Sequence, residues 1–269
     1  MRAVSASIVA GLTAAAHAQP LAEGFNDIDV LPGWVQINRS SPLGDSDWFQ
    51  GNDQVFLAHA GPADSYIAAN FTCAGSFPGL QNLWLLTPTL TLRSGDHLTF
   101  HTRTVEESGF ADRLQLRLST SGSSTNVGST SLSSVGDFAT LLLDINPTYA
   151  LGGVYPETWT AYTVTLAGLP AGGVSGRLAF RYLVEDGGPI GTRGNYIGID
   201  SVSYAAGSCW ANCDSSTAAP ILNIADYVCF LNRFAAGDTR ANCDASTSPP
   251  VLNVADFVCF NNRFQAGCP

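Results

Sequence analysis

The residues with the greatest potential for chemistry lie near the end of the chain, in a segment whose sequence is repeated once. Asn212–Phe230 reads NCDSSTAAPILNIADYVCF, and Asn242–Phe260 reads NCDASTSPPVLNVADFVCF. Over Ala211–Gly237 and Ala241–Gly267 the two copies are identical at 19 of 27 positions. Each copy offers carboxylate, amide and hydroxyl oxygens at alternating positions, and oxygen is the ligand atom that calcium prefers. A short period present twice also indicates that the copies pack together to bury a shared face.

The candidate calcium ligands are two carboxylates, two asparagines and one hydroxyl in each copy. They are Asn212, Asp214, Ser216, Asn223 and Asp226 in the first copy, and Asn242, Asp244, Ser246, Asn253 and Asp256 in the second. Thr217 or Thr247 is the alternative source of the hydroxyl. A second interpretation stays open, because Asn223 and Asp226 also have the spacing of a helix-capping pair. In that case Asn212 and Asp214 would only form a turn.

A helix is predicted after each loop. In ILNIADYVCFLNRF the apolar residues recur at helical spacing, at Ile224, Tyr227, Val228, Leu231 and Phe234. This spacing predicts one buried stripe along the helix. One copy has nothing to cover the stripe, so the second copy is expected to cover it.

Six of the seven cysteines lie in the tail, and Cys73 stands alone before it. On a helix, Cys229 shares a face with Asp226 and is turned toward the loop that contains Cys213. This geometry favours one disulfide within each copy and one that joins the ends of the tail. The predicted pairs are Cys213–Cys229, Cys243–Cys259 and Cys209–Cys268. Six cysteines allow fifteen pairings, and a zinc site is the rival, although no histidine lies in the tail.

The order N-x-D-x-S/T, then L-N-x-x-D and a helix, resembles the calcium loop of an EF-hand and, more closely, a dockerin repeat. On that pattern Asn212 and Asp214 match loop positions one and three, Ser216 falls near five, Asn223 matches nine and Asp226 matches twelve. Three extra residues in the loop and a missing glycine depart from the pattern. The pair of copies resembles the Gly-Cys type of dockerin found at the C-terminus of secreted bacterial proteins. The resemblance implies a calcium-binding anchor whose partner is a cohesin-like domain.

The region from Leu21 to about Ala206 has a different pattern. Apolar and polar residues alternate in DRLQLRLST, GRLAFRYLV, DHLTFHTRTV, TWTAYTVTL and NYIGIDSVSY. A period of two is typical of half-buried strands. Because no clear amphipathic helix separates them, the sequence predicts an antiparallel jelly-roll β-sandwich. The expected organisation is a sandwich over residues 19–206 and a small α-helical, dockerin-like module over residues 207–269.

Several segments of this region, in this order, resemble the cleaved-adhesin or choice-of-anchor J family of extracellular jelly-roll domains. They are EGFNDIDVLPGWVQIN, DWFQGN, NLWLLTPTLTLRSGDHLTFHTRT, and the closing series TWTAYTVTL, GRLAFRYLV and NYIGIDSV. The resemblance implies structural calcium and a role in adhesion or in glycan or protein binding. Glu23 on the first strand and Asp200 on the last are the candidate ligands if those strands are neighbours. Trp34, Trp48 and Trp84 are expected in the core, with stacking on sugars as the alternative.

The N-terminal sequence MRAVSASIVAGLTAAAHAQP has the apolar run and the A-x-A pattern of a secretory signal peptide. It predicts a signal peptide over residues 1–18 and therefore a secreted protein, free or attached to a cell surface. No later apolar run has the roughly 18 residues of a membrane span. A net charge of −10 argues against nucleic acid as a partner. All basic residues are arginine, which excludes lysine bases and P-loop lysines.

The sequence predicts no catalytic site. His97 and His101 share a strand face but stand roughly 13 Å apart, too far for one metal ion. The patterns G-x-S-x-G and H-E-x-x-H are missing. We therefore expect a non-catalytic adhesion or recognition protein, with a dockerin-bearing glycoside hydrolase as the first alternative. Its acids would be Glu106/Glu107 and Glu185/Asp186. A purely structural component of the cell envelope is the second alternative.

Overall fold

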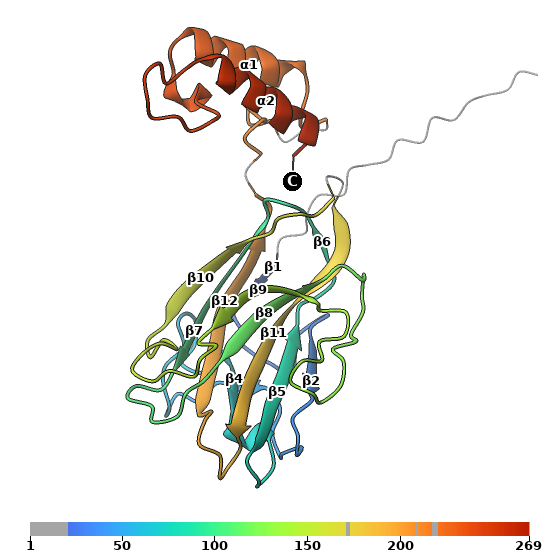
Figure 1. The fold of residues 1–269 in the computed structure, drawn as a ribbon, viewed down its shortest axis with the longest axis vertical. Helices are drawn as coiled ribbons and strands as arrows, with labels where there is room; N and C mark the ends of the chain where they lie inside the picture. The colour runs from blue at the N-terminus through green and yellow to red at the C-terminus, as the bar shows by residue number, and fades with distance from the viewer. Residues whose placement is uncertain (1–20, 171–172, 208, 217–219, 269) are drawn as a thin grey trace, which may run out of the picture.

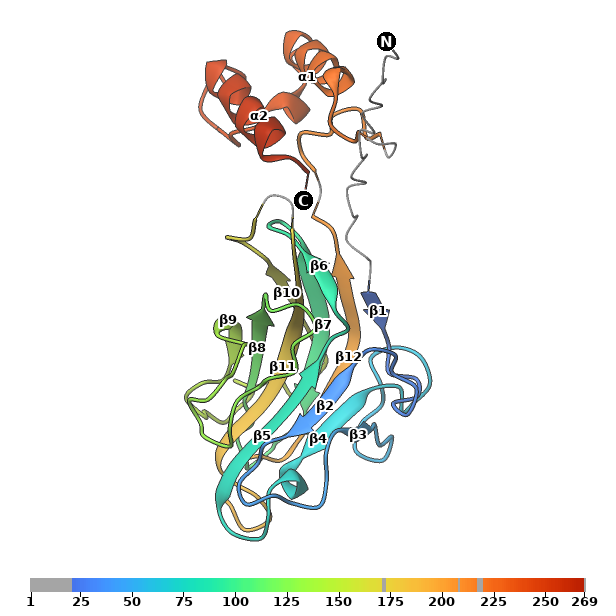
Figure 2. The same cartoon turned by 90° about the vertical axis from the view of Figure 1, so that its right-hand side faces the viewer.

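A computed structural model describes residues 21–170, 173–207, 209–216 and 220–268 (Figure 1). The expected signal peptide lies outside these residues, as does Thr217. Two antiparallel sheets face each other, and two helices follow beyond one end of them (Figure 2). The predicted fold class is confirmed: a jelly-roll β-sandwich is followed by a small helical module.

The first sheet has the strand order β10-β7-β12-β4-β3 among the described residues, and β1 pairs with β12 at its edge. Its strands are β1 (Leu21–Glu23), β3 (Phe49–Gln50), β4 (Ile67–Asn70), β7 (His97–Thr104), β10 (Thr160–Thr165) and β12 (Tyr196–Ala205). Along β7 buried residues alternate with partly exposed ones, as the sequence pattern predicted. Leu98 and Phe100 face the core, so His97, Thr99 and His101 face outward.

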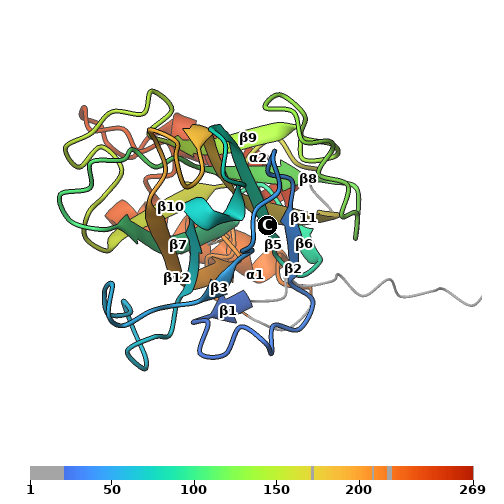
Figure 3. The ribbon, with the colours of Figure 1, turned by 90° about the horizontal axis from the view of Figure 1, so that it is seen from below.

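The second sheet has the order β2-β5-β11-β8-β9, and β6 pairs with β11. Its strands are β2 (Val35–Asn38), β5 (Gly79–Leu86), β6 (Leu90–Leu92), β8 (Leu114–Ser119), β9 (Thr140–Ile145) and β11 (Val174–Gly187). Seen along the sandwich, the two sheets form two layers (Figure 3). Every ladder between these strands is antiparallel, which fits hairpin and Greek-key connections rather than helical crossovers.

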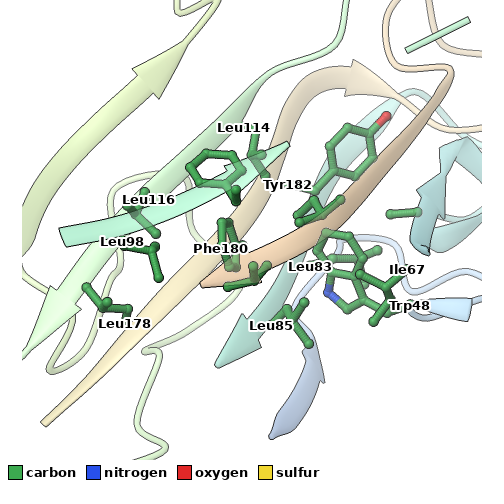
Figure 4. Packing of buried hydrophobic residues seen from close by; sticks show 14 of the residues in the cluster. Trp48, Ile67, Leu83, Leu85, Leu98, Leu114, Leu116, Leu178, Phe180 and Tyr182 are labelled. Carbon is green, nitrogen blue, oxygen red and sulfur yellow. The ribbon is translucent and has the colours of Figure 1, made fainter. Parts of the chain in front are cut away.

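The core lies between the two sheets. Leu83 and Leu85 of β5, Leu116 of β8 and Phe180 of β11 point into it and are almost completely buried (Figure 4). Burying one such side chain stabilises the fold by about 1.5–3 kcal/mol. The alternation seen in the sequence therefore decides which face of each strand turns inward.

The helices of the tail are α1 (Ile224–Ala235) and α2 (Val254–Ala266). The described residues also form two 3-10 turns, η1 (Phe71–Cys73) and η2 (Thr239–Ala241). Each long helix begins with a capping box, in which the asparagine before it and the aspartate in its first turn bond each other's backbone. The sandwich ends just before the tail, where the Gly207 N–H donates to the Asp96 carboxylate over 3.2 Å.

Candidate functional site

The polar side chains at the start of each tail loop bond their own loop. The Asn212 Oδ1 accepts the Ser216 N–H at 3.0 Å, and its Nδ2 donates to the Ser216 carbonyl at 2.8 Å. The Asp214 Oδ1 accepts the same N–H at 2.9 Å. This bond is the main reason why the pKa of the exposed Asp214 lies below its usual value. Bonds of this kind stabilise a turn without a metal.

The second copy repeats this arrangement. The Asn242 side chain accepts the Ser246 N–H and donates to the Ser246 carbonyl, and Asp244 accepts the same N–H. Distances in the two copies agree within 0.1 Å, since these three bonds measure 3.1, 2.8 and 2.9 Å. The duplication in the sequence is therefore a duplication in structure.

The aspartate in the first turn of each helix is completely buried. The Asp226 Oδ2 accepts the Asn223 N–H at 2.9 Å, and its Oδ1 accepts the Asp214 N–H at 3.3 Å. The Asn223 side chain in turn accepts the Ala225 N–H at 2.7 Å. Asp226 thus caps the helix and holds the loop against it at the same time.

In the second copy the corresponding carboxylate makes three such bonds. The Asp256 Oδ1 accepts the N–H groups of Cys243 at 2.8 Å and of Asp244 at 3.3 Å, and its Oδ2 accepts the Asn253 N–H at 2.8 Å. The Asn253 side chain accepts the Ala255 N–H, also at 2.8 Å. The ten predicted ligand residues therefore do come together in two loops, but most of their oxygens already accept backbone N–H groups.

Disulfide bonds close the tail. The structure contains Cys213–Cys229, Cys243–Cys259 and Cys209–Cys268, the three pairs favoured by the geometry of the sequence. All six sulfurs are used in these bonds, which leaves no cysteine thiolate in the tail to bind zinc. Among the described residues, no three His, Cys, Asp or Glu side chains gather as a metal site.

The two copies pack through their aromatic rings. Phe230 stacks on its counterpart Phe260, with ring centroids 4.3 Å apart and planes within 9°. Tyr227 contacts Phe264 at 4.6 Å, and the corresponding pair, Phe234 and Phe257, lies at 4.7 Å. A residue that meets its own counterpart marks a two-fold axis. The copies are therefore related by an internal pseudo-two-fold axis, and each covers the other.

The helix face that packs inward differs from the one expected. Tyr227 and Phe234 do pack into the core, together with Phe230. Ile224, Val228 and Leu231 were expected there but are exposed by 76%, 50% and 44%. The prediction of one stripe was wrong because apolar residues occupy two sides of the helix, and the bulkier aromatic side fills the interface.

The exposed apolar side recurs in the second copy. Val254 and Val258 occupy the positions that correspond to Ile224 and Val228, and they are exposed by 76% and 53%. The i and i+4 residues of a helix lie on one face. Each helix of the tail therefore presents an apolar stripe to solvent, and the pseudo-two-fold axis relates the two stripes.

In the sandwich, the first and last strands are neighbours, as the calcium hypothesis required, but the candidate ligands have other contacts. Glu23 lies opposite Val202 on β12, and its carboxylate accepts the Phe25 N–H at 2.9 Å. The buried Asp200 accepts the N–H groups of His59 and Ala60 at 2.8 and 3.1 Å. Asp200 thus fastens the loop after β3 to the sheet.

The histidines of the sandwich lie on the outer face of the first sheet. His59 stacks on His101, with ring centroids 3.6 Å apart, and its Nδ1 is 3.0 Å from the Ser201 hydroxyl. His97 and Thr165 are joined at 2.9 Å, farther along the same face. Sequence reasoning missed the His59–His101 contact because the loop after β3, and not strand spacing, brings His59 there.

Electrostatics at the stacked pair follow from burial and from like charge. Partial burial is the main cause that lowers the pKa of His101, and the neighbouring His59 lowers it further. Burial also raises the pKa of Asp200, against the effect of its backbone N–H partners. The His101 ring is therefore kept neutral more easily than a free imidazole.

Trp34, Trp48 and Trp84 are buried, as expected of core residues. Trp159, which the sequence analysis did not single out, is partly exposed beside the stacked histidines, with ring centroids 6.3 Å from His59. Gly198 makes room for it, because a Cβ there would lie 2.8 Å from the Trp159 ring. The glycine at position 198 is therefore a sequence signal for this site, but it can be interpreted only when the tertiary structure is known.

The acidic pairs named for a hydrolase have surface contacts. Glu106 lies 3.6 Å from Arg103, and the Glu107 N–H donates to the Glu157 carboxylate at 3.2 Å. The Glu185 carboxylate is 3.4 Å from the Tyr149 hydroxyl, and Asp186 accepts a hydrogen bond from Thr192.

Comparisons with known proteins give the following similarities. No protein-family model matches the chain, and no curated protein matches it in sequence. The sandwich is similar to the K1 cleaved adhesin domain of Lys-gingipain from Porphyromonas gingivalis, with 24% identity over 71% of this chain and 99% of that one and a TM-score of 0.47. The K3 cleaved adhesin domain of the same protein has 20% identity, 70% and 98% coverage, and a TM-score of 0.45.

A family 11 carbohydrate-binding module from Clostridium thermocellum, solved with a mixed-linked tetrasaccharide, is similar at 10% identity. The match covers 71% of this chain and 96% of that module, with a TM-score of 0.33. All three TM-scores are below 0.5.

Proposed function

We propose that this chain is an extracellular, non-catalytic recognition protein, in which the tail docks onto a protein partner and the sandwich binds a ligand. The observation that carries the proposal is the exposed apolar stripe of the tail. Both copies have apolar residues on a side of the helix that faces water, namely Ile224 and Val228 on α1 and Val254 and Val258 on α2. Exposed apolar patches of this kind mark interaction surfaces.

The chemistry of the tail supports an extracellular location. Three disulfides hold a module of about sixty residues, and such bonds persist in oxidising compartments. Neither helix of the described chain has the length and apolar content of a membrane span. We propose a cohesin-like domain as the docking partner of the tail.

The docking proposal is tested with a charge placed on each stripe. We expect the full chain with Val228→Asp and Val258→Asp to lose binding to cohesin-like domains by tenfold or more, since a buried unpaired carboxylate costs more than the roughly 1.4 kcal/mol of a tenfold change. Val30→Asp is the control, because Val30 is an exposed valine of the sandwich, outside the tail. Equal binding by the tail variant and the wild type would contradict the proposal.

For the sandwich we propose a glycan ligand on the outer face of the first sheet. Hydroxyl and imidazole groups occupy this face, with Thr99 and Thr163 joined at 3.0 Å and His97 bonded to Thr165. The threonine hydroxyls of this face can both donate and accept hydrogen bonds, as sugar hydroxyls do. Trp159 at the edge adds an aromatic ring for stacking.

A glycan array probed with the full chain tests the ligand class. The variant Thr99→Val and Thr163→Val keeps the shape of the face but removes two hydroxyls, so we expect at least a tenfold loss of glycan binding. Thr140→Val, on the exposed end of β9 in the other sheet, is the control. An empty array would instead favour a purely structural role, and unchanged binding by the double variant would place the glycan elsewhere.

A further inference from the structure

The calcium expected from the dockerin resemblance has to compete with hydrogen bonds already made in the tail loops. The carboxylate oxygens of Asp226 accept the N–H groups of Asn223 and Asp214, and the side chain has no exposed surface. The Asn212 oxygen accepts the Ser216 N–H. A carboxylate oxygen has two lone pairs, so a cation could share these oxygens only through the lone pairs left free, and those of Asp226 have no exposed surface.

A metal ion bound in such a loop would link the loop to the helix that follows it. Two other connections already make this link. The buried carboxylate of Asp226 links the helix cap to the Asp214 backbone. The Cys213–Cys229 disulfide joins the same loop to the second turn of α1, with Cα atoms 5.7 Å apart. The second copy has both connections as well, with the same Cα separation of 5.7 Å in Cys243–Cys259.

The charge of the buried carboxylate is also compensated. Asp226 and Asp256 each lie in the first turn of a helix, where the positive end of the helix dipole and charge-assisted N–H bonds stabilise an anion. Among the predicted ligands, Asp214 and Asp244 are the other carboxylates, one in each loop. One further carboxylate is little for calcium, which binds six to eight oxygens.

We infer that the tail folds and stays folded without calcium, because in each copy the capping carboxylate and the disulfide replace the metal as the link between loop and helix. The inference concerns the folding of the tail and does not depend on the docking proposal. Amide protection of α1 and α2 reports on it directly, whereas partner binding reports on the exposed stripes.

The test is hydrogen–deuterium exchange of the full, oxidised chain in calcium chloride and in EGTA. We expect the same protection of the α1 and α2 amides in both, since a metal bound only by the folded loops would stabilise them. Protection that falls in EGTA would overturn the inference. A calorimetric titration with calcium chloride accompanies it, and heat from the tail would also overturn it.

Two variants identify the source of any heat and the role of the capping carboxylate. Asp214→Asn with Asp244→Asn changes only exposed carboxylates of the tail. We expect any heat of calcium binding by the sandwich to be the same in this variant. Heat that is lost in the variant would come from the tail. Asp226→Asn with Asp256→Asn turns an acceptor into a donor opposite backbone N–H groups. We expect it to lower protection equally in calcium and in EGTA, and a loss seen in calcium alone would make these residues metal ligands.

Discussion

At the scale of single residues, Cys73 is the one cysteine that forms no disulfide in the described chain. It is completely buried, and burial raises the pKa of its thiol to about 12. The thiolate is the reactive form, so we expect no reaction of the native protein with a thiol reagent at mildly alkaline pH. Unfolding without a reductant should expose one thiol per chain.

The Cys73→Ala variant is the control for this measurement and should show no thiol in either state. One reactive thiol per native chain would show that the side chain is accessible, contrary to its burial. More than one after unfolding would show that a tail disulfide is open.

Asp200 carries a second prediction at this scale. Its carboxylate accepts the N–H groups of His59 and Ala60, and replacing it with alanine leaves both without an acceptor. Hydrogen bonds to a charged group are worth about 1.5–3 kcal/mol each, so Asp200→Ala should lower the free energy of unfolding by about 2 kcal/mol or more. Urea unfolding measures the loss, and faster amide exchange at His59 and Ala60 locates it. The exposed Asp53, on the same loop, provides a control variant with little expected effect.

At the scale of elements, the two sides of α1 should respond differently to truncation. Phe230→Ala removes a ring stacked on Phe260 and should cost about 3–5 kcal/mol. Val228→Ala, two residues away but half exposed, should change stability by no more than about 0.5 kcal/mol. Amide exchange of α1 and α2 measures both. Similar effects of the two changes would mean that the helix buries a different side.

Elements also show how far the sequence predicts this structure. The period-two segments predicted β7, β8, β10, β11 and β12, because apolar residues face the core at every second position, even along β11, where the other face is buried as well. The start of α1 followed from Asn223 and Asp226, because the bonds of the capping box join residues that are close in sequence. Such local signals need no knowledge of the rest of the chain.

Contacts between distant segments were beyond the sequence. Phe230 was left out of the expected stripe, since only the presence of Phe260 opposite makes that side of the helix the interface. The His59–His101 stack depends on how Asp200 fastens a loop to the sheet. In the tail loops, the sequence predicted calcium ligation and left simple capping open as the alternative, because the same oxygens serve both.

At the scale of the whole molecule, buried tyrosines predict how stability changes in alkali. Burial raises the pKa of Tyr66, Tyr155, Tyr182, Tyr196 and Tyr204 above the usual value of 10. Above pH 10 the unfolded chain therefore releases protons that the folded chain keeps. The free energy of unfolding should fall as pH rises, by about 1.4 kcal/mol for each tyrosine raised by one pKa unit.

Urea unfolding at about pH 8 and about pH 11, with phenolate absorbance as a second signal, checks this prediction. Arg181 acts in the opposite direction, since burial lowers its pKa to about 9. One arginine does not offset five tyrosines, so the net slope should be negative. Phenolate absorbance that rises well before unfolding would show that these hydroxyls titrate in the folded state.

The Cys209–Cys268 bond has a consequence for the survival of the protein among proteases. It joins the first and last cysteines of the tail, with Cα atoms 4.9 Å apart, so the backbone between them is a closed ring. A single cut within this ring opens it but releases no fragment, because both sides of the cut stay attached to the sandwich through Cys209. Only a second cut could free a piece, and the two inner disulfides hold part of each copy even then. A nicked molecule would keep its mass, apart from one added water, until a reductant separates the pieces.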